Sequence, residues 1–235
     1  MTAILIPVKE FAEAKKRLAP HFSVEERAAL ADAMCADFFG VVAAVRGAER
    51  VFVASKEPRA LARARELGWE TIVESQQTSE SDSVDEASRY CAEQGVKSLL
   101  RLPVDLPLAQ ASDIEALLAQ AEAAPSAILV PSSDGTGTNA LLRSPATLFP
   151  SHFGPNSFAL HLAEAERSGA RTRVFRNPHL ELDIDELADI QKLSLVLRAE
   201  SATYEWLYLH GKNGLKRSVS AGGRDPLKPT NGKRT

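Results

Sequence analysis

Strand-length apolar runs alternate with segments of helical periodicity along most of this chain, and this rhythm limits the possible folds more than any other feature. The expected strands span Ala3–Val8, Arg50–Ala54, Glu70–Val73, Ser98–Leu102 and Ala127–Pro131. The expected helices between them span Val24–Val45, Pro58–Leu67, Val84–Gln94 and Ser112–Glu122. Strands and helices in alternation are typical of βαβ units, in which parallel strands are covered by helices on both faces.

The pattern changes after Pro131. A short strand is expected at Asn139–Leu142, a helix at Ser157–Ser168, strands at Thr172–Phe175 and Leu180–Asp183, and a helix from about Glu186 to Leu197. The sequence has no internal repeat and no convincing linker before residue 210. We therefore predict one α/β domain over residues 1–209, with a mostly parallel but mixed, Rossmann-like sheet flanked by helices.

The formal charge of −3 is unevenly distributed along the chain. Residues 210–235 contain seven Lys or Arg and one Asp, so their charge is +6 and that of residues 1–209 is −9. This basic tail is rich in Gly, Ser and Pro, and we expect it to be mostly disordered and solvated. The acidic body argues against a nucleic-acid-binding protein. No apolar run is long enough for a membrane span or a signal peptide, so a cytoplasmic location is expected.

Basic residues follow the first strand. Lys9 comes directly after Val8, and Lys15, Lys16 and Arg17 follow a few residues later. In an open α/β sheet the ligand crevice lies outside the carboxyl ends of the strands, so these cations are placed to meet an anionic ligand such as a phosphate. A solvated basic turn is the alternative.

Acidic residues mark the ends of two later segments. Asp105 lies between two prolines just past the strand Ser98–Leu102. Asp183 and Asp185 flank Ile184, and on an extended segment they point the same way while Ile184 packs inward. Carboxylates in this arrangement suit Mg²⁺, which takes one or two carboxylates together with substrate phosphates. Alternatively, Asp105 serves a turn and Asp185 caps the following helix, or Asp-x-Asp belongs to a metal-dependent glycosyltransferase.

Two glycine-containing loops complete the candidate site. In Gly135–Asn139, glycines and short hydroxyl side chains suit the approach of an anion to backbone N–H groups, although the segment lacks the Walker pattern and also fits a plain turn. Gly154 precedes Ser157, which is interpreted either as a helix N-cap or as a phosphate ligand. The histidines show no metal-ligand spacing, and no Ser or Cys nucleophile pattern is present. The predicted chemistry is metal-assisted attack by the phosphate of a substrate.

These motifs, in this order and at this spacing, resemble the phospholactate/phosphoenolpyruvate guanylyltransferases of coenzyme F-420 biosynthesis, relatives of the molybdopterin-guanine-type nucleotidyltransferases. The resemblance covers roughly residues 3–198. It implies a Mg²⁺-dependent, single-domain enzyme with GTP as donor. The implied acceptor is 2-phospho-L-lactate, phosphoenolpyruvate or 3-phospho-D-glycerate, whose phosphate attacks the α-phosphorus of GTP and releases pyrophosphate.

The resemblance also implies roles for particular residues. Asp105, Asp183 and Asp185 would hold Mg²⁺, and Thr138, Gly154 and Ser157 would hold the acceptor. Lys9, Lys15 and Arg17 would face the GTP phosphates as catalytic and nucleotide-binding residues. Ser83-Val84-Asp85 departs from the Gly-Leu-Asn or Pro-Leu-Asn of the family, in a region that lies near the base in related transferases. Asp85 would then accept hydrogen bonds from guanine.

Two other functions stay open on the sequence alone. One keeps the fold and changes the acceptor to a sugar phosphate or a molybdopterin, although the Gly-rich loop of sugar nucleotidyltransferases is absent after Val8. The other is a catalytically silent nucleotide-binding protein. The oligomeric state cannot be predicted, because pattern alone does not separate interface from core.

Overall fold

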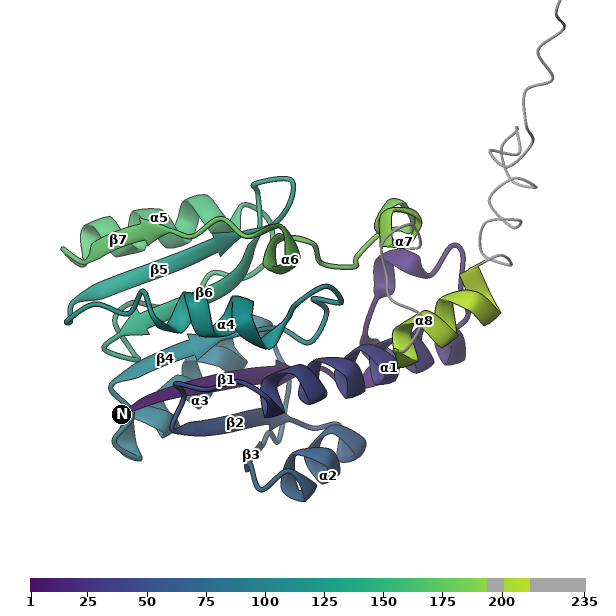
Figure 1. Ribbon diagram of the computed structural model, residues 1–235, viewed down its shortest axis with the longest axis horizontal. Coiled ribbons are helices and arrows are strands. Elements are labelled where there is room, and N and C mark those ends of the chain that lie inside the picture. Colours follow the sequence, from purple (N-terminus) through teal and green to yellow (C-terminus); the bar gives the residue numbers. More distant parts are fainter. Residues whose placement is uncertain (194–200, 212–235) are drawn as a thin grey trace, which may run out of the picture.

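Helices pack on both faces of a central sheet in the computed structural model of the chain, which describes residues 1–193 and 201–211 (Figure 1). Within these residues the sheet has seven strands: β1 Thr2–Val8, β2 Arg50–Ser55, β3 Glu70–Val73, β4 Ser98–Arg101, β5 Ser126–Pro131, β6 Thr138–Ser144 and β7 Arg171–Val174. Their order is β3-β2-β1-β4-β6-β5-β7. Only β6 runs antiparallel to its neighbours, β4 and β5. The predicted fold class, a mostly parallel mixed sheet, is confirmed.

The alternation of side chains along β1 explains the layers. Ile4 and Ile6 face one side of the sheet and pack in a cluster with α1 (Val24–Ala43), α2 (Pro58–Glu66) and α4 (Ala111–Leu118). Ala3 and Leu5 face the other side and pack against α3 (Glu80–Glu93). Farther along the sheet, α5 (Ser157–Arg167) covers the inner strands β5 and β6 on the same side as α3. Both faces of the central strands are therefore buried, as their continuous apolar runs predict.

A further apolar cluster extends the domain beyond the sheet. It joins Leu18, the start of α1, Ile184, α7 (Leu187–Leu193), α8 (Ala202–Trp206) and the single π-helical turn Leu207–Gly211. Figure 1 shows α7 and α8 at the end of α1 that lies past the sheet. The carboxylate of Asp37 on α1 accepts hydrogen bonds from the backbone N–H groups of Ala202 and Thr203, which fixes the start of α8. This cluster holds Ile184, and the acidic residues on either side of it, next to the basic segment after β1.

The expected strand at Leu180–Asp183 is wrong. Residues Pro178–Glu181 instead form a short helix, α6, that starts with Asn177 as N-cap and proline at its first position. The side chain of Asn177 accepts hydrogen bonds from the N–H groups of His179 and Leu180, and this cap outweighs the strand-like alternation of the sequence.

Other expectations reach the edge of the described residues. The helix expected as far as Leu197 is seen over Leu187–Leu193, and residues 194–200 lie outside the description. Most of the tail expected to be disordered, residues 212–235, also lies outside it. Among the described helices, none has the length and apolar character that crossing a membrane requires.

Candidate active site

A cavity of about 550 Å³ opens at one edge of the sheet. It lies past the carboxyl ends of β1, β4 and β5, where Lys9, Val104 and Ser132 line it. Because β6 is antiparallel, its amino end lies at the same edge and adds Thr138. The cavity therefore occupies the place where open α/β sheets bind their ligands.

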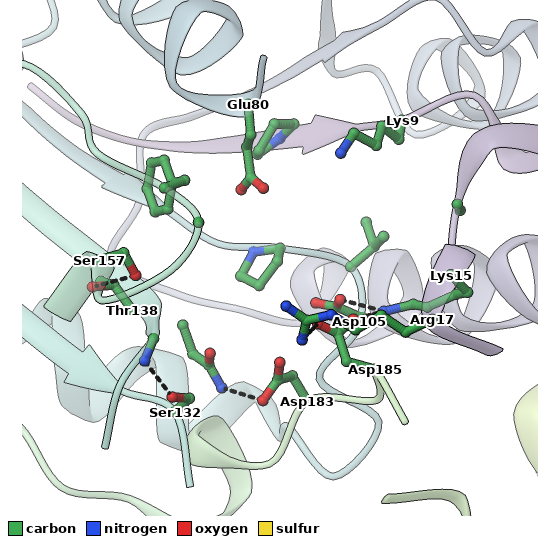
Figure 2. A pocket seen from close by; sticks show the side chains of 18 of the residues that line it. Lys9, Lys15, Arg17, Glu80, Asp105, Ser132, Thr138, Ser157, Asp183 and Asp185 are labelled. Atoms are coloured by element: carbon green, nitrogen blue, oxygen red, sulfur yellow. Dashed lines mark hydrogen bonds and ion pairs between the residues drawn. The ribbon is translucent and has the colours of Figure 1, made fainter. Parts of the chain in front are cut away.

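The three predicted aspartates lie together on one wall of this cavity (Figure 2). Asp105 and the segment of Asp183 and Asp185 are joined directly, because the N–H of Ile184 donates to the backbone oxygen of Asp105 at 3.3 Å. Ile184 is fully buried, as the alternation along this segment predicts. The side chain of Asp185 does not cap α7, since Asp189 accepts the hydrogen bonds of the N–H groups of residues 185 and 186.

Lys15 lies among these carboxylates. Its ammonium group is 2.5 Å from Asp105 Oδ2 and 3.3 Å from Asp185 Oδ1, and its side chain is only 8% exposed. Its backbone is left-handed, with φ 53° and ψ 40°, in the tight connection between the 3-10 turns Phe11–Glu13 and Lys16–Leu18. Arg17 reaches the other oxygen of Asp185 at 3.2 Å from the solvent side. Two of the three predicted cations thus meet two of the three predicted metal ligands.

The charges in this group shift one another's pKa. Burial alone would lower the pKa of Lys15, but Asp105 and Asp185 outweigh it and raise the pKa. Burial alone would raise the pKa of Asp105, but Lys15 outweighs it and lowers the pKa. For Asp183, burial and the repulsion of the other two carboxylates raise the pKa to about 6, against a hydrogen bond from Asn139. The group therefore has more negative charge than Lys15 neutralises.

This donor set suits a hard divalent cation. Mg²⁺ prefers carboxylate oxygens and tolerates few of them when waters and phosphates complete its shell. As the side chains stand, no three acidic, His or Cys residues in the described part of the chain form a ready-made metal site. Lys15 occupies the space between Asp105 and Asp185 instead. The carboxylates therefore fit Mg²⁺ by their chemistry. In this structure the ammonium group of Lys15 supplies the positive charge between two of them.

The end of β1 is fixed by hydrogen bonds from neighbouring elements. The backbone oxygen of Val8 accepts from Ser55 Oγ at 2.7 Å and from Gln77 Nε2 at 3.0 Å, and Gln77 also accepts from the N–H of Glu10. Lys9 lies between these anchors, is exposed, and extends along the upper edge of the cavity in Figure 2. The third predicted cation is thus close to the ligand space and is separate from the aspartates.

Two buried hydroxyl groups lie on the opposite wall. Thr138 and Ser157 are 6% and 2% exposed, and Ser157 Oγ donates to Thr138 Oγ1 at 3.4 Å. Asn156, with φ 58°, is the residue that precedes α5, so Ser157 is inside the helix and is not its N-cap. Gly154, with φ 121°, lies in the loop before α5 in a conformation that favours glycine. The three predicted acceptor residues therefore line one part of the cavity.

The Gly135–Asn139 loop does not offer its amides to an anion. The N–H groups of Thr136 and Gly137 donate to the side chains of Asp134 and Ser132, and Ser132 in turn donates to Asp134. These hydrogen bonds lower the pKa of Asp134 to about 2. Asp134 thus takes the place that the sequence-based interpretation gave to a bound anion.

Asp85, which was predicted to contact guanine, lies away from the cavity. Its carboxylate accepts from the N–H of Ser151 at 3.0 Å and lies 3.6 Å from the buried guanidinium of Arg143. It is not among the residues that line the cavity. Asp85 faces the loop after β6 because Arg143, which is 1% exposed, needs a nearby anion. The predicted contact with guanine is therefore not retained.

Sequence reasoning missed Arg101, the last residue of β4. Its guanidinium is buried, forms an ion pair with Glu80, donates to the backbone oxygen of Asn139 at 3.1 Å, and stacks on Phe153 at 4.1 Å. Burial lowers the pKa of Arg101 to about 10. The signal in the sequence is a charged residue that ends a buried apolar strand. Arg101 joins α3, β6 and the loop before α5 near the wall that holds Thr138 and Ser157.

The fold and this cavity define a class, the nucleotidyltransferase-like α/β proteins. A structure described as a nucleotide-diphospho-sugar transferase, from Desulfovibrio desulfuricans, matches with a TM-score of 0.71 and 15% identity, over 92% of this chain and 97% of that one. The structure of 4-diphosphocytidyl-2C-methyl-D-erythritol synthase matches with a TM-score of 0.54 and 13% identity, over 83% and 96%. At such identities the likeness is one of fold.

Sequence comparison identifies the family within this class. The model of the family "Guanylyl transferase CofC like" matches residues 2–221, and the chain belongs to this family. It is 39% identical to the phosphoenolpyruvate guanylyltransferase of Rubrobacter xylanophilus, over 80% of this chain and 91% of that protein. It is 31% identical to the 2-phospho-L-lactate guanylyltransferase of Methanothermobacter thermautotrophicus, over 83% and 84%.

Proposed function

We propose that this chain transfers GMP from GTP to a three-carbon phosphorylated acid in coenzyme F-420 biosynthesis. An oxygen of the acceptor phosphate bonds to the α-phosphorus of GTP, the bond to the β-phosphate breaks, and pyrophosphate leaves. Phosphoenolpyruvate is the first acceptor to test, because the more similar of the two relatives named above carries that name. 2-Phospho-L-lactate and 3-phospho-D-glycerate are the other members of the panel.

The observation that carries this proposal is the division of one cavity into two chemically different walls. One wall holds the carboxylates together with Lys15 and Arg17, and the other holds the buried hydroxyls of Thr138 and Ser157. Nucleotidyl transfer needs this division, since a charged triphosphate and a separate phosphorylated acceptor must be held side by side.

Each wall then has a role in the transfer. Lys9, Lys15 and Arg17 bind the triphosphate and stabilise the negative charge that develops as pyrophosphate leaves. Thr138, Ser157 and the N–H of Gly154 orient the acceptor so that its phosphate oxygen points at the α-phosphorus. The protein forms no covalent intermediate in this scheme, and its contribution is to position the two substrates and to neutralise charge.

Asp105, Asp183 and Asp185 would hold Mg²⁺. When bound, the ion withdraws charge from phosphate oxygens and so favours attack at phosphorus. The raised pKa of Asp183, which burial and its acidic neighbours cause, supports this role, because the carboxylates are close enough to repel one another. Lys15, which pairs with Asp105 here, would contribute its positive charge to binding the phosphates.

Guanine would lie against the segment from the end of β3 to the first residue of α3. Glu74, Gln77 and Glu80 line the cavity there, and carboxylates accept hydrogen bonds from the N1 and N2 hydrogens of guanine. The Glu80 carboxylate faces the open space in Figure 2, and one of its oxygens pairs with Arg101. This assignment replaces the one made to Asp85.

The decisive experiment is a matrix of substrates. The protein is incubated with each of the four nucleoside triphosphates against the three acceptors, in Mg²⁺ or in EDTA, and pyrophosphate and adduct mass are measured. We expect a guanylylated phosphoacid with GTP and Mg²⁺. Turnover with another nucleotide only, with a sugar phosphate only, or with no pair at all from folded protein would contradict the proposal.

A pair of variants tests the wall that holds Asp105, Asp183 and Asp185. Asp183→Asn should lower kcat by about 100- to 1,000-fold, the usual effect of removing one contact that stabilises a transition state. The matched control is Glu122→Gln, which changes a carboxylate that pairs with arginines of β7 and does not line the cavity. Equal activity of the two variants would remove Asp183 from the site.

A further inference from the structure

His161 lies directly behind the wall of the cavity that holds the hydroxyl groups of Thr138 and Ser157, called the hydroxyl wall below. It is on α5, is 0% exposed, and packs between Phe149 and Phe153. Its Nδ1 is 2.9 Å from Thr138 Oγ1, and its Nε2 accepts a hydrogen bond from the backbone N–H of His152 at 2.8 Å. His161 does not line the cavity, so any effect on a ligand passes through Thr138.

The contact with His152 determines where the ring proton of His161 lies. A backbone N–H can only donate, so Nε2 must present its lone pair. Burial, and then the nearby cations Arg143 and Arg101, lower the pKa of His161 to about 3, so the ring is neutral at ordinary pH. A neutral imidazole has one proton, which is therefore on Nδ1. The Nδ1–H group donates to Thr138 Oγ1.

This tautomer sets the polarity of the hydroxyl wall. Because Thr138 Oγ1 accepts from His161, its own hydrogen is left to point elsewhere. In the opposite tautomer, Ser157 would donate to Thr138 and Thr138 would donate to Nδ1, so both hydroxyl hydrogens would be used inside the protein. Such a wall would present only lone pairs, which repel an anion. With the proton on Nδ1, one hydroxyl hydrogen is left to donate to a ligand in the cavity, which Thr138 and Ser157 both line.

We infer that His161 is a positioning residue that fixes the Thr138 hydroxyl as a hydrogen-bond donor to an anionic oxygen of the acceptor. The inference rests on the proposed function, in which Thr138 contacts the acceptor. Thr138 and Ser157 are buried, so a donor held in the right direction discriminates strongly between an anion and a neutral group. The acceptor group recognised here is a phosphate or carboxylate oxygen.

The first test examines the tautomer and needs no substrate. The ¹⁵N shifts of the His161 ring, in protein labelled at histidine, should show a protonated Nδ1 and an unprotonated Nε2. His161→Gln provides the assignment. A spectrum with the proton on Nε2, or a doubly protonated ring at neutral pH, would overturn the inference whatever reaction the protein catalyses.

The second test separates acceptor binding from the rest of catalysis. His161→Phe removes both ring nitrogens, whereas His161→Gln keeps one acceptor and one donor on its amide. We expect His161→Phe to raise the KM for phosphoenolpyruvate by about 10- to 100-fold, as loss of a hydrogen bond to a charged group would, with an unchanged KM for GTP. His161→Gln should restore most of the affinity. His179→Gln, which alters a histidine paired with Asp113 away from the hydroxyl wall, is the matched control.

The outcomes distinguish this inference from the proposed function. If wild-type protein transfers GMP to a different acceptor, the same comparison is made with that acceptor. If it has no transferase activity, the proposed function fails while the ring spectrum still decides the tautomer. Equal increases in both KM values, or additive effects of His161→Phe and Thr138→Val on acceptor KM, would show that His161 has only a structural role. If His161→Phe does not fold, the glutamine variant and the spectrum decide the question.

Discussion

Removal of the Asp85 carboxylate should destabilise the protein without changing which nucleotide it uses. Asp85 accepts from the N–H of Ser151 with both oxygens, each at 3.0 Å, and is 3.6 Å from Arg143. Arg143 is 1% exposed, and its other hydrogen-bond acceptors are the neutral oxygens of Phe149 and Ser88. Within the described residues, Asp85 is therefore the one anion paired with the buried guanidinium of Arg143.

The expected size follows from these contacts. Loss of one partner of a fully buried ion pair costs about 3–5 kcal/mol. Asp85 is 23% exposed, and Arg143 keeps two neutral acceptors, so we expect about 2–3 kcal/mol for Asp85→Ala. Asp85→Asn keeps an acceptor for Ser151 and loses only the charge, so its cost should be about 1–2 kcal/mol. For a chain of this size each kcal/mol lowers the Tm by about 2–4 °C.

Urea unfolding and a thermal scan measure the stability, and kcat/KM for GTP and ATP measures the selectivity. We expect the order wild type, Asp85→Asn, Asp85→Ala in stability, with the same preference for GTP in all three proteins. Glu86→Ala, at the neighbouring exposed position on α3, is the control. A loss of less than about 0.5 kcal/mol in Asp85→Ala would refute the role of the ion pair, since that is the usual range of surface substitutions. A changed preference for GTP would instead support the original prediction that Asp85 contacts guanine.

Three further changes follow from the cavity. Gly137→Ala would place a Cβ atom 2.8 Å from Ser132 Oγ, so the loop must shift. We expect kcat/KM for the acceptor to fall by about 10- to 100-fold, and wild-type kinetics would contradict this. Lys15→Met should lower the Tm in EDTA and increase the stabilisation that Mg²⁺ gives, because Lys15 neutralises Asp105 and Asp185; equal Mg²⁺ shifts in variant and wild type would refute it. Deletion of residues 212–235 should leave kcat and KM nearly unchanged, since the cavity is lined by residues between Pro7 and Lys192; a large loss would assign a function to the tail.

The strands and the main helices could be predicted because their buried faces require apolar residues at a regular spacing in the sequence. β1 is buried on both faces and reads as a continuous apolar run, and Ser23 forms the capping box with Glu26 that starts α1. The short helix α6 was missed because its apolar residues alternate as in a strand. Its Asn-Pro start was nevertheless visible in the sequence and is a helix signal.

The site was predictable only where a residue type implies a role by itself. Carboxylates and cations after strands indicate a polar cleft, and the structure does bring Asp105, Asp183 and Lys15 together. Nothing in the sequence gives the direction of β6, which places Thr138 at the ligand edge. The contact of Asp85 with Arg143 was equally hidden, because it joins residues 58 positions apart that follow no local pattern. Long-range pairing decides such cases, and a single sequence does not contain it in readable form.

Packing, rather than attraction between charges, assembles the acidic and basic segments of the cavity. The ion pair of Arg17 and Asp185 is 63% and 40% exposed, and a pair of this kind contributes about 0–1 kcal/mol. Ile184 is fully buried in the same cluster as Leu18, and burial of such a side chain contributes about 1.5–3 kcal/mol. Because Leu18 follows Arg17 and Ile184 lies between the two aspartates, the apolar contact determines where the charges stand. The framework that holds these charges therefore does not depend on the exposed ion pair between them.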